Sequence, residues 1–524
     1  MSMIFKSIST LPFTVVGYAV PTLLSCLFVY TTYQIFLHPL RGYPGPLLAK
    51  LTDAYGGFYA FQRRLHLKTR ENQHNYGSVV RQGPNKLVFN TIEAVRDIYK
   101  NDRTTKSKAY IHLGPNLTIE TTVTARNRHV HRSRRHFVGQ VLSERFMRIF
   151  EPTMMSQVDL FIQHIHESAK ESAPVNITQR SKYLGFNLAA LLGFGYDLEL
   201  QTSEDNRFMP KTLEAGEFWS GLFFHWPNAR KLLAGLVFVQ ILRQKGGKYF
   251  SLMEKMITSR MRQGKDAKRD LYSIVGDALD SKTGGIRRSD LWAEANLFLP
   301  AAGDTTKTAL SAVFFYLSRN PECYKKLAHE IRSTFSTGAE IRGPALANCQ
   351  YLRACIDEAL RMSPPASGIL WRELLPDSDD RPFIVDGHVI PGGTIVGVNI
   401  YSIHHNEEYF PDSFSFRPER WLDDSVTPER KRIMRDGFIP FSVGPRGCAG
   451  KAMAYLEISL VVAKTLWYFD FGWAQGGLGE IGAGAPGMGV GRERPGEFQL
   501  LDSFTASHDG PYLEFRERYC AEDV

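Results

Sequence analysis

Residues 441–450 read FSVGPRGCAG and lead into an apolar run, residues 449–469, whose pattern predicts a helix. The motif places Cys448 at the start of that helix, where the helix dipole and free backbone N–H groups stabilise a thiolate. The glycines of the motif allow tight turns and a close approach of the backbone to a flat ligand. Arg446 could pair with a carboxylate of such a ligand. A lone cysteine is more often an inert buried side chain, but this surrounding pattern favours a reactive thiolate.

A second motif, AAGDTT at residues 301–306, lies in an apolar stretch that starts near Trp292 and predicts a long helix. Asp304 and Thr305 place a carboxylate and a hydroxyl side by side, and groups of this kind relay protons. Alternatively, Thr305 bonds back to its own helix and Asp304 is solvated.

A third set of residues consists of charged side chains at helical spacing. Glu358 and Arg361 are three residues apart, which makes them neighbours on one helix face. Arg420 follows in the segment FRPERW. Taken alone, Glu358 and Arg361 are typical of an exposed surface pair, which contributes little stability.

The motif F-x-x-G-x-R-x-C-x-G resembles the haem-binding signature of the cytochrome P-450 superfamily. All its defining positions are matched, at Phe441, Gly444, Arg446, Cys448 and Gly450. The resemblance implies a P-450 fold, a haem b cofactor and Cys448 as the ligand of the iron. In this family thiolate donation favours cleavage of the O–O bond.

The same resemblance gives roles to the other motifs. AAGDTT is similar to the distal oxygen-binding element, which implies that Asp304 and Thr305 are the acid and alcohol of the catalytic pair. Ala302 stands where the family has glycine, Gly303 follows one residue later and Pro300 precedes both. We therefore expect the helix distortion of this element to be displaced.

The resemblance also implies a buried structural triad, formed by Glu358, Arg361 and Arg420. A W/H-x-x-x-R pattern and the segment ILWREL imply contacts to the haem propionates, at His131, Arg135 and Arg372. The alternative for the basic segment around His131 is a solvated helix face. The implied substrate pocket comprises Ser107 to Arg126, the helix around Ala301, Ala366 to Leu370, and Ser503 to Thr505.

Composition excludes several classes of protein. Hydrophobic residues make up 43% and charged residues 22% of the 524 residues, values typical of globular proteins. The net charge is +9, but the sequence has no repeated basic-aromatic units and no zinc-finger spacing, so we expect no nucleic-acid partner. Six cysteines in so long a chain do not predict a disulfide scaffold. We expect a reducing compartment and unused glycosylation sequons at Asn116 and Asn176.

The N-terminal segment predicts a membrane anchor. Residues 11–37 contain no charged residue and exceed the roughly 20 residues that a spanning helix needs. Basic residues are more frequent after this segment than before it, which predicts a cytosolic catalytic body. We divide the chain into an anchor (1–38), a Pro-rich extended hinge (39–50) and a haem-thiolate monooxygenase domain (51–524). The expected location is the endoplasmic reticulum membrane, with a single span.

The predicted fold class is mainly α with small β-sheets. SVVRQG and KLVFNT, around the turn at residues 83–85, predict two short strands. Helical spacing dominates residues 143–360, and strand-like runs return between residues 372 and 403.

The resemblance to fungal microsomal P-450 enzymes predicts a monooxygenase that inserts one oxygen atom into a lipophilic small molecule, in secondary metabolism. Electrons are expected from NADPH through NADPH-cytochrome reductase, with cytochrome b5 as a second candidate donor. Two alternatives stay open: a haem-thiolate isomerase or dehydratase, and a haem protein that binds a ligand without turnover.

Overall fold

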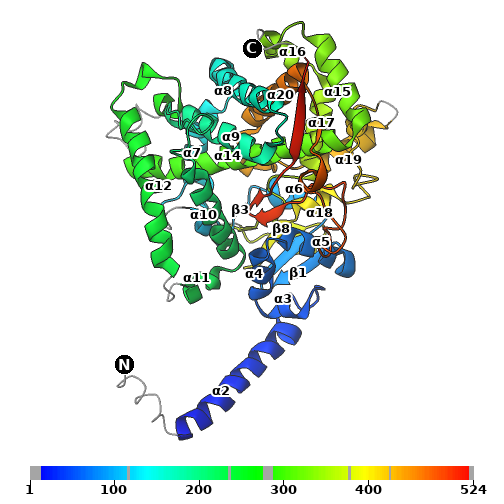
Figure 1. Cartoon of the computed structure of the whole chain (residues 1–524). Coiled ribbons are helices and arrows are strands. Elements are labelled where there is room, and N and C mark those ends of the chain that lie inside the picture. The colour runs from blue at the N-terminus through cyan, green and yellow to red at the C-terminus, as the bar shows by residue number, and fades with distance from the viewer. Residues whose placement is uncertain are drawn as a thin grey trace.

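The computed structural model describes residues 13–114, 118–233, 238–274, 287–375, 379–423 and 426–518. Asn116 and both ends of the chain lie outside these residues. Helices form most of the molecule, and the sheets are small (Figure 1). This arrangement confirms the predicted fold class.

Ten of the described helices are longer than twelve residues, and α7 and α15 are given below with the shorter ones. The other eight follow here. They are α2 (Phe13–Thr32), α8 (Glu144–Lys170), α9 (Ile177–Phe194), α10 (Phe208–His225), α12 (Phe238–Met261), α14 (Arg288–Arg319), α17 (Gln350–Met362) and α20 (Lys451–Tyr468). The other helices are α3 (Leu47–Leu51), α4 (Ala54–Phe61), α5 (Leu65–Tyr76), α6 (Ile92–Tyr99), α7 (Arg128–Val141), α11 (Pro227–Leu233), α15 (Pro321–Thr334), α16 (Gly343–Ala347), α18 (Ile400–His404) and α19 (Pro428–Gly437).

The largest sheet has five strands in the order β1-β2-β8-β5-β3. Its strands are β1 (Val79–Gly83), β2 (Lys86–Phe89), β3 (Thr104–Lys106), β5 (Arg372–Leu374) and β8 (Ile395–Val398). The predicted pair β1 and β2 is antiparallel, and β2 also pairs in parallel with β8, which is far away in the sequence. The sheet thereby brings the N-terminal part of the chain against the segment that carries Arg372.

Three smaller sheets complete the fold. They comprise β4 (Val175–Asn176), β12 (Tyr512–Glu517) and β9 (Phe469–Trp473); β10 (Leu501–Ser503) and β11 (Thr505–Ser507); and β6 (Ile384–Val385) and β7 (His388–Val389). The β10–β11 pair packs beside α14 and α10.

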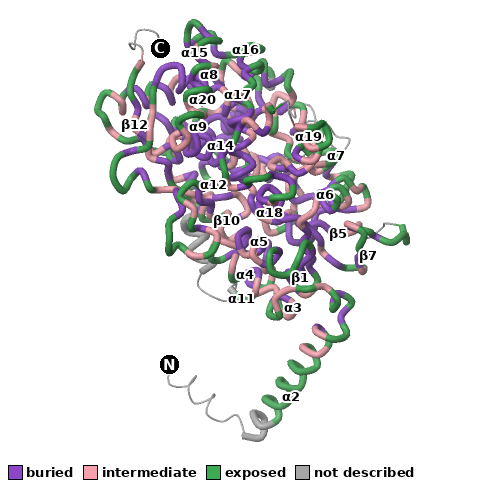
Figure 2. The backbone as a smooth tube through the Cα atoms, turned by 90° about the vertical axis from the view of Figure 1, so that its right-hand side faces the viewer, coloured by how far each residue is buried: buried purple, intermediate pink, exposed green. Residues whose placement is uncertain are grey.

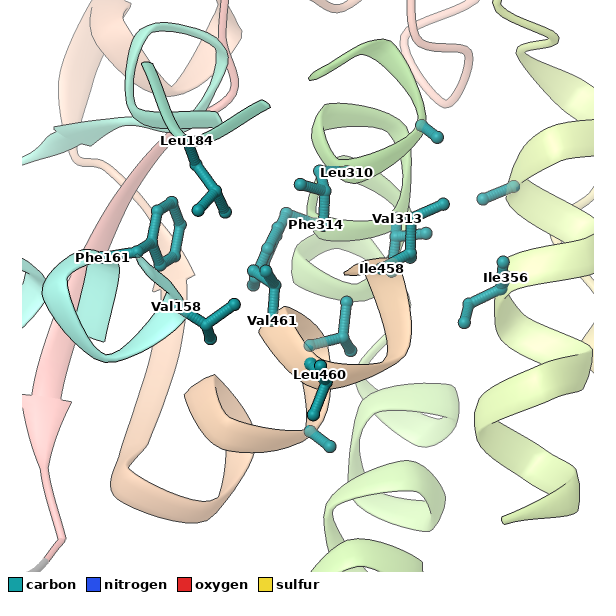
Figure 3. Packing of buried hydrophobic residues seen from close by; sticks show 14 of the residues in the cluster. Val158, Phe161, Leu184, Leu310, Val313, Phe314, Ile356, Ile458, Leu460 and Val461 are labelled. Carbon is teal, nitrogen blue, oxygen red and sulfur yellow. The ribbon is translucent and has the colours of Figure 1, made fainter. Parts of the chain in front are cut away.

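Helix α14 crosses the middle of the helical part (Figure 1) and packs most extensively against α9. The two helices approach closely at Gly303, where an added Cβ would lie 2.7 Å from the Phe186 ring. Side chains of α8, α9, α14, α17 and α20 point toward one another in the core (Figure 3), among them Phe161, Phe314 and Val461. Because α14 and α20 share this core, the AAGDTT motif and the helix that follows Cys448 are held in a fixed relation.

The anchor helix projects from one end of the body (Figure 1), and most of its described surface is exposed (Figure 2). Among the described residues, the stretch Tyr18–Leu37 is long and apolar enough to cross a membrane. At its end, a π-helical turn, η1 (Tyr33–Leu37), contacts the body. The buried Arg81 guanidinium donates hydrogen bonds to the Gln34 carbonyl (2.9 Å) and to Gln34 Oε1 (2.7 Å).

The segment 39–50 differs from the expected extended hinge. Leu40 and Ala49 are buried against the body, and a helix begins at Leu47, directly after Pro46. Proline fits at a helix start because its missing N–H has no intrahelical partner there. The prolines therefore lie between a turn and a short helix, so the segment is not extended throughout.

Candidate functional site

The loop before α20 has a backbone that requires glycine. A 3-10 turn, η6 (Gly444–Arg446), begins at Gly444, whose φ of +74° lies in the left-handed region. A Cβ at this position would lie 2.1 Å from the Tyr99 carbonyl oxygen. The Cys448 N–H donates to the Phe441 carbonyl at 2.8 Å and closes the loop. The turn thus presents Cys448 immediately before the first residue of α20.

The Cys448 thiol is accessible, although the loop is surrounded by protein. That burial raises the pKa of the thiol above its usual value and outweighs the Gly450 N–H and the charges of Arg135 and Lys451, which lower it. Arg135 reaches this loop from α7 and donates to the carbonyls of Gly447 (2.8 Å) and Cys448 (3.2 Å). The loop therefore collects three groups that favour the thiolate over the thiol.

Next to this loop lies a basic cluster, which we define as His131, Arg135, Arg372, Arg446 and Lys106. Burial, followed by the charges of Arg446, Lys106, Arg135 and Arg372, lowers the pKa of His131 to about 3. The fold thus brings together His131, Arg135, Arg372 and Arg446, which come from three separate segments of the sequence.

The cations of the basic cluster are bonded to neutral groups. Arg372 donates to the Tyr110 hydroxyl at 2.9 Å, and Arg446 donates to the Ala125 carbonyl at 2.7 Å. Lys106 donates to the carbonyls of Thr122 and Val123. Among the described residues, none of Lys106, Arg372 and Arg446 has a carboxylate within ion-pair distance. A group of largely buried cations without acidic partners is costly, so the cluster is suited to an anionic ligand.

Lys106 was not identified from the sequence, and Tyr110 was included only in the implied substrate pocket, not as a partner of Arg372. Lys106 is buried on β3, and burial together with the charges of Arg372, Arg446 and Arg135 lowers its pKa well below the usual value. The local sequence TTKSKAY gives no sign of this environment, because it arises from the pairing of β3 with β5.

The charged set on α17 forms a buried triad. The Glu358 carboxylate accepts from Arg361 Nη2 and from Arg420 Nε, both at 2.9 Å. Trp421 Nε1 and the Arg417 N–H also donate to it. Burial by itself raises the pKa of Glu358, but the charges of Arg361 and Arg420 and their hydrogen bonds lower it below the usual value. These residues connect α17 to the segment that leads toward the Cys448 loop.

On α14, Thr305 and Asp304 of the AAGDTT motif differ in solvent exposure and in hydrogen-bond partners. The Thr305 hydroxyl donates to the Ala301 carbonyl at 2.7 Å, and Ala301 is exposed in the middle of the helix. Asp304 is 1% exposed, and its Oδ1 accepts from Lys307 Nζ at 2.7 Å. The helix is continuous through Pro300. The structure therefore places Thr305 at an accessible surface, whereas Asp304 is neither solvated nor adjacent to solvent.

Comparison with known proteins decides the family. The model of the family described as Cytochrome P450 matches residues 44–480. The chain is a cytochrome P450. This P450 is 34% identical to the cytochrome P450 monooxygenase apf7 of Gibberella fujikuroi, with 94% of this chain and 96% of the relative covered. It is 32% identical to the cytochrome P450 monooxygenase AKT7 of Alternaria alternata, with 93% and 94% covered, and 30% identical to atnE of Emericella nidulans, with 94% of each covered.

Membership in the family makes this P450 a haem monooxygenase that receives electrons from a reductase and acts on a small molecule. The residues present fit a haem. An accessible cysteine heads α20, and the basic cluster beside it contains cations that would hold the carboxylates of such a group. The glycine at position 444 keeps the loop backbone free of a side chain at its closest approach to Tyr99.

Proposed function

We propose that this P450 binds haem b with Cys448 as the iron ligand and inserts one oxygen atom of O2 into a lipophilic small molecule. The observation that carries this proposal is the accessible Cys448, which lies at the start of α20 among groups that favour its thiolate. When bound, the haem supplies the site at which dioxygen is activated. The other steps fall to residues of the chain.

In this proposal the basic cluster holds the propionates. Arg372, Lys106 and Arg446 are fixed in place by their bonds to the Tyr110 hydroxyl and to backbone carbonyls. His131 and Arg135 complete the set from α7. Charge-assisted hydrogen bonds of this kind are about twice as strong as neutral ones. Phe441, Gly444 and Gly450 shape the loop that would present Cys448 to the haem.

Glu358, Arg361 and Arg420 have a structural role. They fix α17 relative to the segment before the Cys448 loop through the ion pairs described above. Their burial explains why an exposed surface pair is the wrong interpretation of the spacing of Glu358 and Arg361.

For proton delivery we propose Thr305 and Asp304. Thr305 Oγ1 lies on the accessible side of α14, where it can hold a proton for transfer to the reacting oxygen. Asp304 is the adjacent acid, and its Oδ2 has no hydrogen-bond partner among the described residues. A carboxyl oxygen that is buried and unpaired is able to accept and release a proton.

We further propose that α2 anchors the P450 by a single span in the endoplasmic reticulum membrane, with the catalytic body in the cytosol. Electrons then come from NADPH through NADPH-cytochrome reductase, and cytochrome b5 is a second candidate donor. The length and exposure of Tyr18–Leu37 support membrane association. The similarity to fungal P450 monooxygenases supports a role in fungal secondary metabolism, on a terpenoid, polyketide or alkaloid.

The test is oxygen uptake by full-length protein in microsomes with reductase and NADPH, on a panel of lipophilic compounds from a producing fungus. We expect product formation that depends on NADPH and falls about 10²-fold in Thr305→Ala, which removes the proton-bearing hydroxyl. Thr305→Ser keeps a hydroxyl and serves as the matched control, with activity near that of the parent. Product formation without NADPH would overturn the proposal and favour an isomerase or dehydratase.

A further inference from the structure

A group of charged side chains, partly buried and partly exposed, links α14, α10 and α9 and includes no member of the basic cluster. Lys307 Nζ contacts Asp304 Oδ1 at 2.7 Å and Glu214 Oε1 at 3.2 Å. Glu214 in turn pairs with Lys182 at 2.6 Å. Lys307 is 1% exposed, whereas Glu214 is 30% exposed. The ion pairs therefore form a continuous chain from the buried Asp304 on α14, through α10, to the surface at α9.

Glu217 adds a third carboxyl to this group. It lies three residues after Glu214 on α10, and Thr505 Oγ1 of β11 donates to its Oε2 at 2.7 Å. One turn further, Gly221 packs so closely on Ser503 that a Cβ would lie 2.9 Å from the Ser503 carbonyl. Helix α10 thus holds Glu217 against the β10–β11 pair, near Asp304.

The charges of this group do not balance. Asp304, Glu214 and Glu217 contribute three carboxyls, and Lys307 and Lys182 contribute two ammonium groups. Among the described residues, His508 is a further titratable neighbour, and its pKa is held well below its usual value by burial and then by the charges of Lys307 and Lys182. His508 is therefore neutral and does not supply the missing positive charge. Without a proton on one carboxyl, the group carries an unpaired negative charge next to Asp304 and Lys307, which are each 1% exposed, while Glu217 is half-buried; such a charge is unfavourable.

Contacts indicate which carboxyl carries the proton. Lys307 binds Asp304 and Glu214 directly, which favours the ionised form of both, and the pKa of Glu214 is lowered. At Asp304 burial outweighs the effect of Lys307, so the pKa of this carboxyl is also raised. Glu217 has a hydrogen bond only from the neutral Thr505 hydroxyl among the described contacts. Burial and then the charge of Asp304 raise the pKa of Glu217 well above its usual value, against the Thr505 hydrogen bond and the more distant Lys307. The charge of Glu214 raises it further.

We propose that Glu217 holds a proton beside Asp304 in the resting P450, and that the chain Lys307–Glu214–Lys182 connects this pair to the surface. This inference rests on the proposed roles of Asp304 and Thr305. One proton passes from Glu217 to the unpaired Oδ2 of Asp304, which leaves Glu217 anionic until a proton from solvent returns by way of Glu214. No electron moves in this exchange. Lys307 is a positioning residue, since it fixes Oδ1 of Asp304 and leaves Oδ2 free.

The test uses infrared spectroscopy of the purified full chain in detergent micelles, without turnover. A protonated carboxyl has a C=O stretching band that a carboxylate lacks. We expect the parent-minus-Glu217→Gln difference spectrum at pH 7 to contain this band, and the band to disappear as the pH is raised. Thr505→Val, which removes the hydrogen bond to Glu217, should shift the same band to higher wavenumber.

Glu322→Gln is the control, because Glu322 lies on an exposed pair with Lys325 and is ionised at this pH. Its difference spectrum should contain no band of a protonated carboxyl. The inference is overturned if the spectra of the parent and Glu217→Gln coincide at pH 7 and Thr505→Val leaves the band unshifted. Together these results would show that Glu217 is ionised.

A second measurement separates this inference from the proposed function. The amount of product per NADPH consumed should fall at alkaline pH in the parent, when Glu217 ionises, and should be independent of pH over the same range in Glu217→Gln. If Thr305→Ala retains the product yield of the parent while the infrared band is present, the proposed proton delivery fails and the assignment of Glu217 stands. A parent-like alkaline decline in Glu217→Gln contradicts the inference instead.

Discussion

Replacement of Glu358 by alanine should be among the most damaging substitutions outside the Cys448 loop. Five hydrogen bonds end on the Glu358 carboxylate: two from Arg361 and one each from Arg420, Trp421 and the Arg417 N–H. The side chains of Arg361 and Arg420 are 0% and 1% exposed, so neither can turn to solvent when the carboxylate is removed.

Removal of one partner from a buried ion pair costs about 3–5 kcal/mol. Two arginines lose the same partner here, so we expect the upper part of that range. A cost of this size is a large fraction of the stability of a typical protein. The Glu358→Ala variant should therefore retain little haem.

The assay is the haem absorbance of detergent-solubilised protein as a function of urea concentration. Glu322→Ala is a matched control, because Glu322 and Lys325 have the same three-residue spacing but are exposed. This control should lose haem at the same urea concentration as the parent. If Glu358→Ala behaves like the control, the triad does not hold the fold around the site.

Two further predictions concern the loop and the helix on either side of Cys448. Gly444→Ala should abolish haem binding, because φ is +74° and the new Cβ would lie 2.1 Å from the Tyr99 carbonyl; parent-like haem absorbance would contradict this. Burial raises the pKa of Glu457 to about 8, and neither oxygen of this carboxyl has a hydrogen-bond partner among the described residues, so its ionisation destabilises the folded state as the pH rises from the unfolded value of roughly 4.3 toward 8. Glu457→Gln should therefore be increasingly more stable than the parent over that range, by up to about 1.4 kcal/mol per pH unit, and a stability difference that is the same at pH 5 and pH 8 would refute the cause.

Short motifs predicted much of the site because the spacing of residues within a loop or helix turn determines which side chains lie close together. Cys448 and its glycines lie within one loop, and Glu358 and Arg361 lie on one helix turn, so the sequence alone identified them. Spacing alone does not predict whether Glu358 and Arg361 form a structural pair or a weak surface contact, because burial decides between the two.

The contacts that the sequence did not predict join distant segments. Lys106 enters the basic cluster because β3 pairs with β5, and nothing in its local sequence indicates an anionic ligand. The pairing of Asp304 with Lys307 is local, at three residues, but Lys307 also contacts Glu214 of α10, which is distant in the sequence. Proline spacing likewise suggested an extended hinge at residues 39–50, whereas Pro46 precedes a short helix that packs on the body.

The carbon-monoxide difference spectrum of the reduced, full-length protein tests the role of Cys448 most directly. Thiolate ligation of the iron gives the carbon-monoxide complex of this family a characteristic absorption maximum. We predict this spectrum for the parent and its loss in Cys448→Ser, with Cys26→Ser, at an exposed cysteine of α2, unchanged. An identical spectrum in the parent and in Cys448→Ser would contradict the assignment of the iron ligand.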